Sequence, residues 1–195
     1  MPRRSASRSS RKEYETREGK VKNNSYAARQ VYKVIINAPI DTVWSELIKT
    51  TSPRPFFWNS SWDTPSMKPG KPFRMLSADK RAVGVVGEFL EMDPPRLLSH
   101  TFRLTSLDDP PSKVTYTLNE TPDGVEFCLI TENIVAGSKS EKSMDAGAKF
   151  IVENFKAFVE TGQPKLGARL VNAMYALMGP MTPKALRAEN WPLKG

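Results

Sequence analysis

The chain has 195 residues, with 29 Lys and Arg, 21 Asp and Glu, one cysteine, one histidine and a net charge of +8. One cysteine excludes an internal disulfide, and with a single histidine it cannot form a Cys/His zinc site. Since the sequence shows no metal-ligand cluster and no Gly-rich phosphate loop, we expect no metal and no cofactor. No apolar run reaches the ~18 residues that span a bilayer, and no apolar stretch follows the basic N-terminus as in a secretory signal. These features are typical of a cytoplasmic protein.

Residues 1–29 hold nine Lys and Arg and three Glu, and therefore carry +6 of the net charge of +8. They are rich in Arg and Ser and lack apolar periodicity, so we predict a disordered basic tail. We interpret it as a solvated tail, while contacts with phosphates, anionic lipid or an organelle import receptor stay open. Because the remaining residues carry only +2, no specific binding to nucleic acid is expected.

Residues 31–37 are rich in β-branched side chains and read as the first strand, and residues 39–49 read as a helix that Pro39 opens. Proline suits the first helical turn because its missing N–H would have no partner there, and Asp41 complements the positive end of the helix dipole. The apolar residues at helical spacing on this helix are Ile40, Val43, Trp44 and Leu47. Residues 50–70, rich in Pro and aromatics, are predicted to hold a short second helix and a loop.

Five strands at short spacing follow, over residues 71–78, 82–92, 96–105, 113–120 and 125–135. Pro94 and Pro95 mark one turn between them, because proline presets turn dihedrals and disrupts central strands. The last two strands form a hairpin whose alternating residues place Tyr116 and Phe127 on one side.

Residues 138–160 are predicted as a long helix, which Ser138 or Ser140 caps and Gly162 ends. Its apolar residues at helical spacing are Ala148, Ile151, Val152, Phe155, Phe158 and Val159. A strand, a helix, a run of antiparallel strands and a long helix make an α+β layout. The long helix is the element that must cover the apolar face of the sheet.

Residues 165–195 are predicted as a C-terminal helical extension, with a last short helix over residues 183–189. Its apolar residues recur at helical spacing at Leu166, Leu170, Met174, Leu177 and Met178. We expect this row to pack onto the chain's own domain. A dimer contact or a membrane-surface helix is the alternative.

Three segments carry a resemblance to a known superfamily: residues 38–44 (APIDTVW), 87–98 (GEFLEMDPPRLL) and 154–164 (NFKAFVETGQP). Their order and spacing resemble the START-like (SRPBCC) superfamily, and most closely the domain of activators of the heat-shock-protein-ninety ATPase. The resemblance implies a helix-grip domain over residues 30–164, in which a curved antiparallel sheet wraps around the long C-terminal helix. Related sequences often have Gly-Trp near the start of that helix, whereas Gly147 is here followed by Ala148.

The fold that this resemblance implies is usually built around an apolar cavity between the sheet and the long helix. His100 falls on the same strand face as Phe102, which should point to the core or the cavity, so it is either a satisfied core histidine or a group that orients a ligand. Phe57 and Trp58 either pack in the core or gate the cavity mouth. The candidate ligand-binding residues are His100, Phe102, Trp44, Phe57, Trp58, Tyr116 and Phe155.

Three functions stay open at this point. The first is a START-like domain that binds an apolar small molecule or lipid, with no catalytic residue assigned. The second, which the resemblance motivates, is a co-chaperone-like module whose partner is the heat-shock-protein-ninety ATPase. The third is a cyclase- or hydrolase-type enzyme that uses the same cavity, with His100 as its base. A homodimer is a further candidate assembly.

Overall fold

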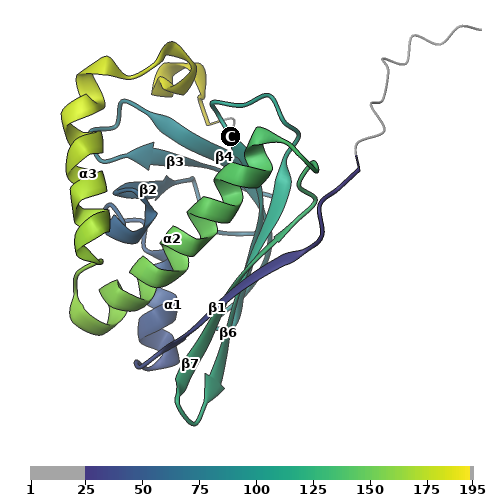
Figure 1. Ribbon diagram of the computed structural model, residues 1–195, viewed down its shortest axis with the longest axis vertical. Coiled ribbons are helices and arrows are strands. Elements are labelled where there is room, and N and C mark those ends of the chain that lie inside the picture. The colour runs from purple at the N-terminus through teal and green to yellow at the C-terminus, as the bar shows by residue number, and fades with distance from the viewer. Residues whose placement is uncertain (1–24, 194–195) are drawn as a thin grey trace, which may run out of the picture.

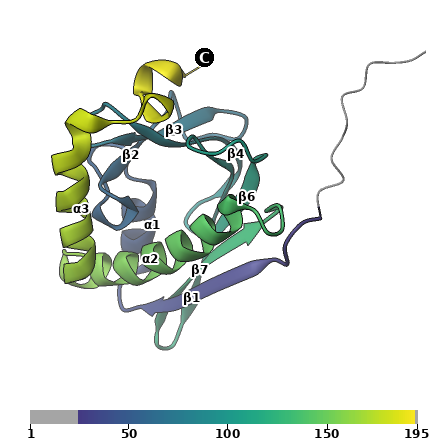
Figure 2. The same cartoon turned by 45° about the horizontal axis from the view of Figure 1, so that its top comes forward.

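Seven antiparallel strands form one curved sheet in the computed structural model, which describes residues 25–193. The sheet order is β1-β7-β6-β5-β4-β3-β2. The strands are β1 (Gln30–Ile36), β2 (Ser60–Asp63), β3 (Pro72–Ser77), β4 (Val83–Asp93), β5 (Leu97–Leu104), β6 (Ser112–Thr121) and β7 (Gly124–Glu132). Figure 2 shows the sheet curving from β1 and β7 round to β3 and β2, with the long helix α2 (Lys139–Thr161) across its open side. This confirms the predicted α+β helix-grip fold.

The hairpin of β6 and β7 forms as predicted, with Tyr116 and Phe127 on the same face. Its opposed pairs on the concave face are Val114 with Thr131, Tyr116 with Leu129, and Leu118 with Phe127. The turn closes at Gly124, whose φ is 127°. A side chain there would start 2.5 Å from the carbonyl oxygen of Ile36, so only glycine fits.

The helix termini follow the predicted capping rules. Helix α1 (Ile40–Ile48) begins directly after Pro39 and buries Val43, Trp44 and Leu47. At the start of α2, the Ser138 hydroxyl accepts a hydrogen bond from the Glu141 amide at 3.1 Å. At its end, Gly162 has a left-handed φ of 76° and its amide donates to the carbonyl of Phe158.

One face of α2 covers the sheet, as Figure 1 shows for the helix that crosses in front of the strands. The buried apolar residues of that face are Met144, Ala148, Ile151, Val152 and Phe155. The Phe155 ring lies 4.6 Å from the ring of Phe56 and 4.8 Å from that of Phe127, measured between centroids. The main core therefore joins α2 to the sheet and to the segment that follows α1.

That segment was predicted to hold a short second helix and a loop within residues 50–70, without a strand. It contains one 3₁₀ turn, η1 (Pro55–Phe57), followed by the short strand β2. Trp58 and Asn59 have positive φ values of 48° and 54°, which reverse the chain. The reversal brings Ser60 into an antiparallel bridge with Arg54, and β2 then adds to the sheet edge beside β3. The two left-handed residues thus end the 3₁₀ turn, and a strand stands where a loop was predicted.

Residues 25–29 differ from the predicted disordered tail of residues 1–29. The Ala27 amide donates to the carbonyl of Ile134, and Tyr26 forms a bridge with Val135, so this segment continues the pairing of β1 beyond the end of β7. The prediction for residues 1–24 lies outside the described residues.

The C-terminal extension consists of α3 (Leu166–Met178) and three single turns, η2 (Gly179–Met181), η3 (Lys184–Leu186) and η4 (Ala188–Asn190). Its inner side is fixed by hydrogen bonds: Asn172 Nδ2 donates to the carbonyl of Pro55, and Arg74 Nη1 donates to the carbonyls of Ala188 and Trp191. The expectation that its apolar row packs on the domain is wrong for Leu166, Leu170, Met174 and Leu177, which are all exposed. Helical spacing predicts an apolar row but not what covers it.

Candidate functional site

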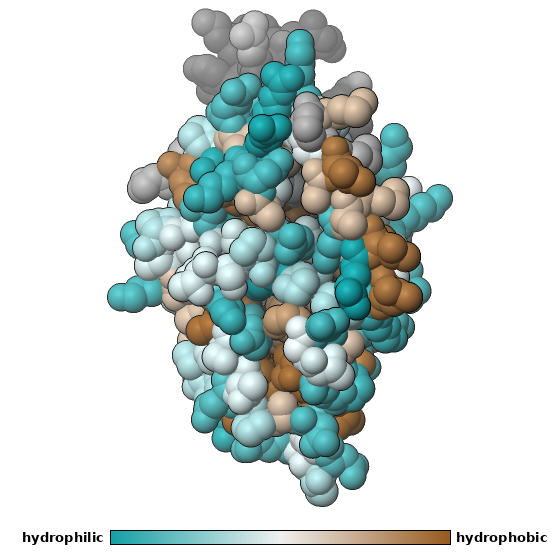
Figure 3. Space-filling model, turned by 90° about the vertical axis from the view of Figure 1, so that its left-hand side faces the viewer, coloured by the Kyte–Doolittle hydropathy of each residue, from teal (hydrophilic) through white to brown (hydrophobic). Residues whose placement is uncertain are grey.

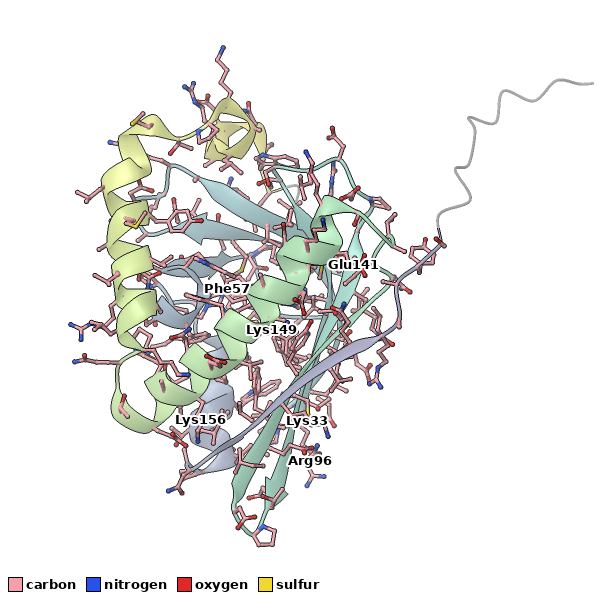
Figure 4. All side chains as sticks on the ribbon, viewed as in Figure 1. Lys33, Phe57, Arg96, Glu141, Lys149 and Lys156 are labelled. Carbon is pink, nitrogen blue, oxygen red and sulfur yellow. The ribbon has the colours of Figure 1, made fainter. Side chains whose placement is uncertain are left out.

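A cavity of about 400 Å³ lies between the sheet, α2, η1 and the C-terminal extension. Most of its wall is apolar. The apolar side chains that line it include Phe57, Trp58, Met75, Val85, Phe102, Leu104, Val114, Leu129, Met144, Ala148, Ile151 and Leu186. In Figure 4, Phe57 lies in the interior between α3, α2 and the strands of the sheet edge. The cavity therefore occupies the part of the fold where the sheet is least covered by α2.

Small residues of α2 leave room for this cavity. Ala148 lines it and is almost fully buried, so a larger side chain at this position would project into the open volume. Gly147 lies one residue earlier, and a Cβ there would stand 3.2 Å from Trp58 Cη2. The Trp58 indole stacks on Phe150 of the same helix, with centroids 4.8 Å apart and planes within 10°. Trp58, which follows η1, and the two small residues Gly147 and Ala148 of α2 thus form this side of the cavity.

The polar residues that line the cavity are serines, Thr131 and two tyrosines, of which Tyr116 on β6 is buried and Tyr175 is exposed. Burial raises the pKa of Tyr116 to about 12, although the charge of Arg54 opposes the rise. The hydroxyl is therefore protonated at neutral pH and able to donate a hydrogen bond. The hydroxyls of Ser60 and Thr131 also line the cavity, but they already bond to Phe57 and Gln30 within the protein.

Four of the seven residues predicted as ligand-binding line the cavity: Phe57, Trp58, Phe102 and Tyr116. The other three, Trp44, His100 and Phe155, are buried but are not among the lining residues. Trp44 belongs to the buried face of α1, and Phe155 packs between Phe56 and Phe127. The structure thus places four candidates around the same cavity and three in the surrounding core.

His100 lies in a cluster of aromatic rings. Its ring centroid is 5.0 Å from that of Phe73 and 5.5 Å from that of Trp62. Nδ1 lies 2.8 Å from the carbonyl oxygen of Thr101, which can only accept, so Nδ1 carries the proton. Nε2 has no hydrogen-bond partner among the described residues. Burial, helped by the charge of Arg54, lowers the pKa of His100 to about 4, so the ring is neutral at pH 7.

Arg54 is a buried cation beside the cavity that the sequence analysis missed. Its guanidinium donates to the carbonyl of Leu47 in the last turn of α1 at 3.3 Å and to Met75 Sδ at 3.2 Å. It also stacks over Trp62 and Phe57, with 4.4 Å and 5.0 Å from Cζ to the ring centroids. Burial lowers the pKa of Arg54 to about 9. The helix end and the aromatic faces compensate its charge, and Phe57 and Met75 are held in the cavity wall.

Other lining residues also escaped the sequence analysis. Leu129 could have been found, because it lies opposite Tyr116 in the predicted hairpin. Met144 could have been found as well, since it precedes Ala148 by one helical turn. Tyr175 and Leu186 come from the C-terminal extension, and no signal in the sequence indicates that they reach the cavity.

The site offers a mainly apolar enclosure in which Tyr116 supplies a buried, neutral hydroxyl. Within residues 25–193, no group of three or more His, Cys, Asp or Glu side chains is placed to hold a metal ion. None of the helices in this range is long and apolar enough to cross a membrane. What the geometry supports is enclosure of a ligand with mainly apolar surface.

Solved structures with the same fold come from several organisms. A protein from Rhizobium leguminosarum is 16% identical, with a TM-score of 0.56 over 70% of this chain and 97% of that chain. A solution structure from Cytophaga hutchinsonii is 23% identical, with a TM-score of 0.55 over 71% and 97%. An HSP90 activator from Plasmodium falciparum is 15% identical, with a TM-score of 0.55 over 71% and 99%. At these identities the likeness shows the fold alone.

The sequence itself gives the family. No curated protein matches the chain, but a family model described as Activator of Hsp90 ATPase homolog 1-like protein matches residues 37–160. These residues span α1, β2 to β7 and almost all of α2, which together enclose most of the cavity. The chain therefore belongs to the family of Activator of Hsp90 ATPase homolog 1-like proteins, whose START-like fold it shares.

Proposed function

We propose that this domain binds an apolar small molecule or lipid in the cavity between its sheet and α2. The observation that carries the proposal is the cavity itself: about 400 Å³, with an apolar wall. Binding sites for small molecules are mostly apolar hollows of ~300–1,000 Å³ with a few polar groups that orient the ligand. Tyr116 fits the orienting role, because its buried hydroxyl is a neutral donor in an apolar wall.

Filling the cavity tests this proposal directly. Ala148→Trp would place an indole in the open volume beside Ile151. We expect the parent protein to bind the neutral fluorescent probe N-phenyl-1-naphthylamine with one site per chain, and Ala148→Trp to bind it at least tenfold more weakly. Titration of the probe, followed by its fluorescence, gives both the stoichiometry and the affinity.

Lys149→Trp is the matched control, because Lys149 is the next residue of α2 and its side chain is 61% exposed. The control adds the same indole outside the cavity and should bind the probe as the parent does. Equal weakening by both variants, or an unchanged affinity in Ala148→Trp with its native melting temperature, would argue against a ligand in this cavity.

The family match favours a second candidate, a chaperone-binding module. The matched family is named for activators of the Hsp90 ATPase, and one protein with the same fold is described as an HSP90 activator. In this case the chain would raise the ATPase rate of Hsp90, and Ala148→Trp would leave that effect unchanged. An enzyme with His100 as its base is less well supported, because His100 is not among the residues that line the cavity.

A further inference from the structure

Helix α3 presents an apolar row to the outside of the molecule. We name Leu166, Leu170, Met174 and Leu177 the exposed stripe, and their exposed fractions are 68%, 61%, 61% and 81%. Met181 in η2 follows the stripe and is 79% exposed. Figure 3 views the molecule from the side of α3 and shows apolar side chains at its surface. Four large apolar side chains in one row on one helix are more than scattered exposure explains.

The exposed stripe points away from the rest of the chain. At ~100° per residue, its four members fall within a sector of about 80°. Ala168 and Asn172 lie on the opposite side, where Ala168 is 2% exposed and Asn172 bonds to the carbonyl of Pro55. The small residue Ala168 and the polar residue Asn172 therefore hold the helix to the domain, and within residues 25–193 nothing covers its apolar face.

The charge around the stripe is positive. Residues 165–195 contain five Lys and Arg and one Glu, which gives +4, whereas residues 30–164 contain fifteen basic and seventeen acidic residues, which gives −2. Arg169 lies about 60° from Leu166 around the helix, at the border of the stripe. Beyond α3, Lys80, Arg81 and Arg187 line a surface hollow next to Gly179. Arg81 pairs there with Asp79 and Arg187 with Glu189, so this hollow adds one net positive charge. The apolar face thus lies in the basic part of the described residues.

We propose that α3 docks on the surface of an anionic lipid bilayer, with the exposed stripe among the acyl chains and the flanking basic residues at the headgroups. An amphipathic helix of this composition, ~20 Å long, suits a position in the plane of the interface. A second copy is the less suitable occupant. In a two-fold dimer the stripe would face itself, and the same basic residues would be brought together.

The proposal goes beyond ligand binding and does not depend on it. It does place the bilayer-facing stripe next to the cavity, since Tyr175 of α3 and Leu186 of η3 line the cavity. The helix would then lie between the bilayer on its outer side and the cavity on its inner side.

Sedimentation of the full chain with vesicles is the first test. We expect binding to phosphatidylcholine vesicles that contain phosphatidylglycerol, and at least tenfold weaker binding to vesicles of phosphatidylcholine alone. Combined Leu170→Gln, Met174→Gln and Leu177→Gln should weaken binding to the anionic vesicles at least tenfold. Glutamine keeps the charge and nearly the helix propensity of the parent residues, and residues 1–29 are present in every variant.

Leu90→Gln is the matched control, because Leu90 on β4 is an apolar side chain with 43% exposure outside the stripe. It should bind the anionic vesicles as the parent does. A second measurement avoids the triple substitution: an NBD dye on Met174→Cys should shift its emission to the blue with anionic vesicles, and the same dye on Leu90→Cys should not. Cys128 is buried, so the introduced thiol is the reactive one.

Three results would overturn the proposal. The triple variant could bind as tightly as the parent, which would assign the binding to other basic residues. The dye at position 174 could show no shift. Light scattering could reveal a dimer of the parent that the triple variant lacks, which would make a second copy the occupant of the stripe.

Discussion

Replacing Phe155 with alanine tests whether α2 is held on the sheet by the apolar face that the structure assigns to it. Phe155 is fully buried, and its ring touches one aromatic ring on η1 and another on β7. Because these neighbours belong to different elements, they cannot close the resulting hole together. We therefore expect the free energy of unfolding to fall by about 3–5 kcal/mol. A domain of this size has ~5–15 kcal/mol in total, so the variant should be visibly unstable.

Urea denaturation, followed by tryptophan fluorescence, measures this loss. Lys149→Ala is the control on the same helix. Its side chain is 61% exposed and makes one ion pair with Asp145 a turn away, so its removal should cost about 0.5 kcal/mol or less. If Phe155→Ala were as mild as Lys149→Ala, α2 would not be anchored through this face, and the assignment of the core would be refuted.

Two further predictions concern a titrating group and a helix end. Burial lowers the pKa of His100 from 6.5 to about 4. Between these two pH values the unfolded chain binds more protons than the folded one, so the free energy of unfolding should fall by about 3 kcal/mol from pH 7 to pH 4. Urea denaturation at several pH values should show a shallower fall in His100→Phe, and equal slopes would contradict the neutral imidazole. Gly162→Ala should lower the free energy of unfolding by about 1 kcal/mol, because the φ of Gly162 is 76°. Gly167→Ala inside α3 is the control and should not destabilise the protein. Equal melting temperatures for the two variants would argue against the left-handed cap.

Local rules predicted most of the elements, because each rests on chemistry within a few residues. The cap at Ser138 and the stop at Gly162 both depend on neighbours in the chain. Strand β2 was missed for the opposite reason. Its four residues contain one apolar side chain, Trp62, so no alternation marks it. It becomes a strand only because β3 is available to pair with it.

The same dependence on distant neighbours explains why the candidate site was predicted only in part. Alternation along β5 correctly puts His100 and Phe102 on one face, and Phe102 lines the cavity. It cannot tell that Trp62 and Phe73, from β2 and β3, pack around His100. The strand pattern determines the side on which a residue points, but the curvature of the sheet decides which neighbours cover it.

Lys156 shows that contacts between distant segments also escape prediction at the surface of the molecule. Helix geometry predicts that it points away from Phe155 and contributes little to stability. In the structure, its ammonium group donates to the carbonyl of Ile35 and pairs with Glu160, and Glu160 also accepts from the amide of Asn37. The residue therefore fastens α2 to the end of β1, which is why Lys149 serves better as a control. Figure 4 shows both lysines on α2.

The boundary of the family match bears on the proposed ligand binding. The match ends at residue 160, whereas Tyr175 and Leu186, which complete one wall of the cavity, lie beyond it. The sheet and α2, which lie within the family match, thus supply one part of the cavity wall. The C-terminal extension, which lies outside the match, supplies another part. Since shape and polarity of the whole enclosure select a ligand, a ligand found for a relative cannot be transferred on the matched residues alone. Any ligand preference particular to this chain is therefore expected to depend on the extension, whose other face carries the exposed stripe.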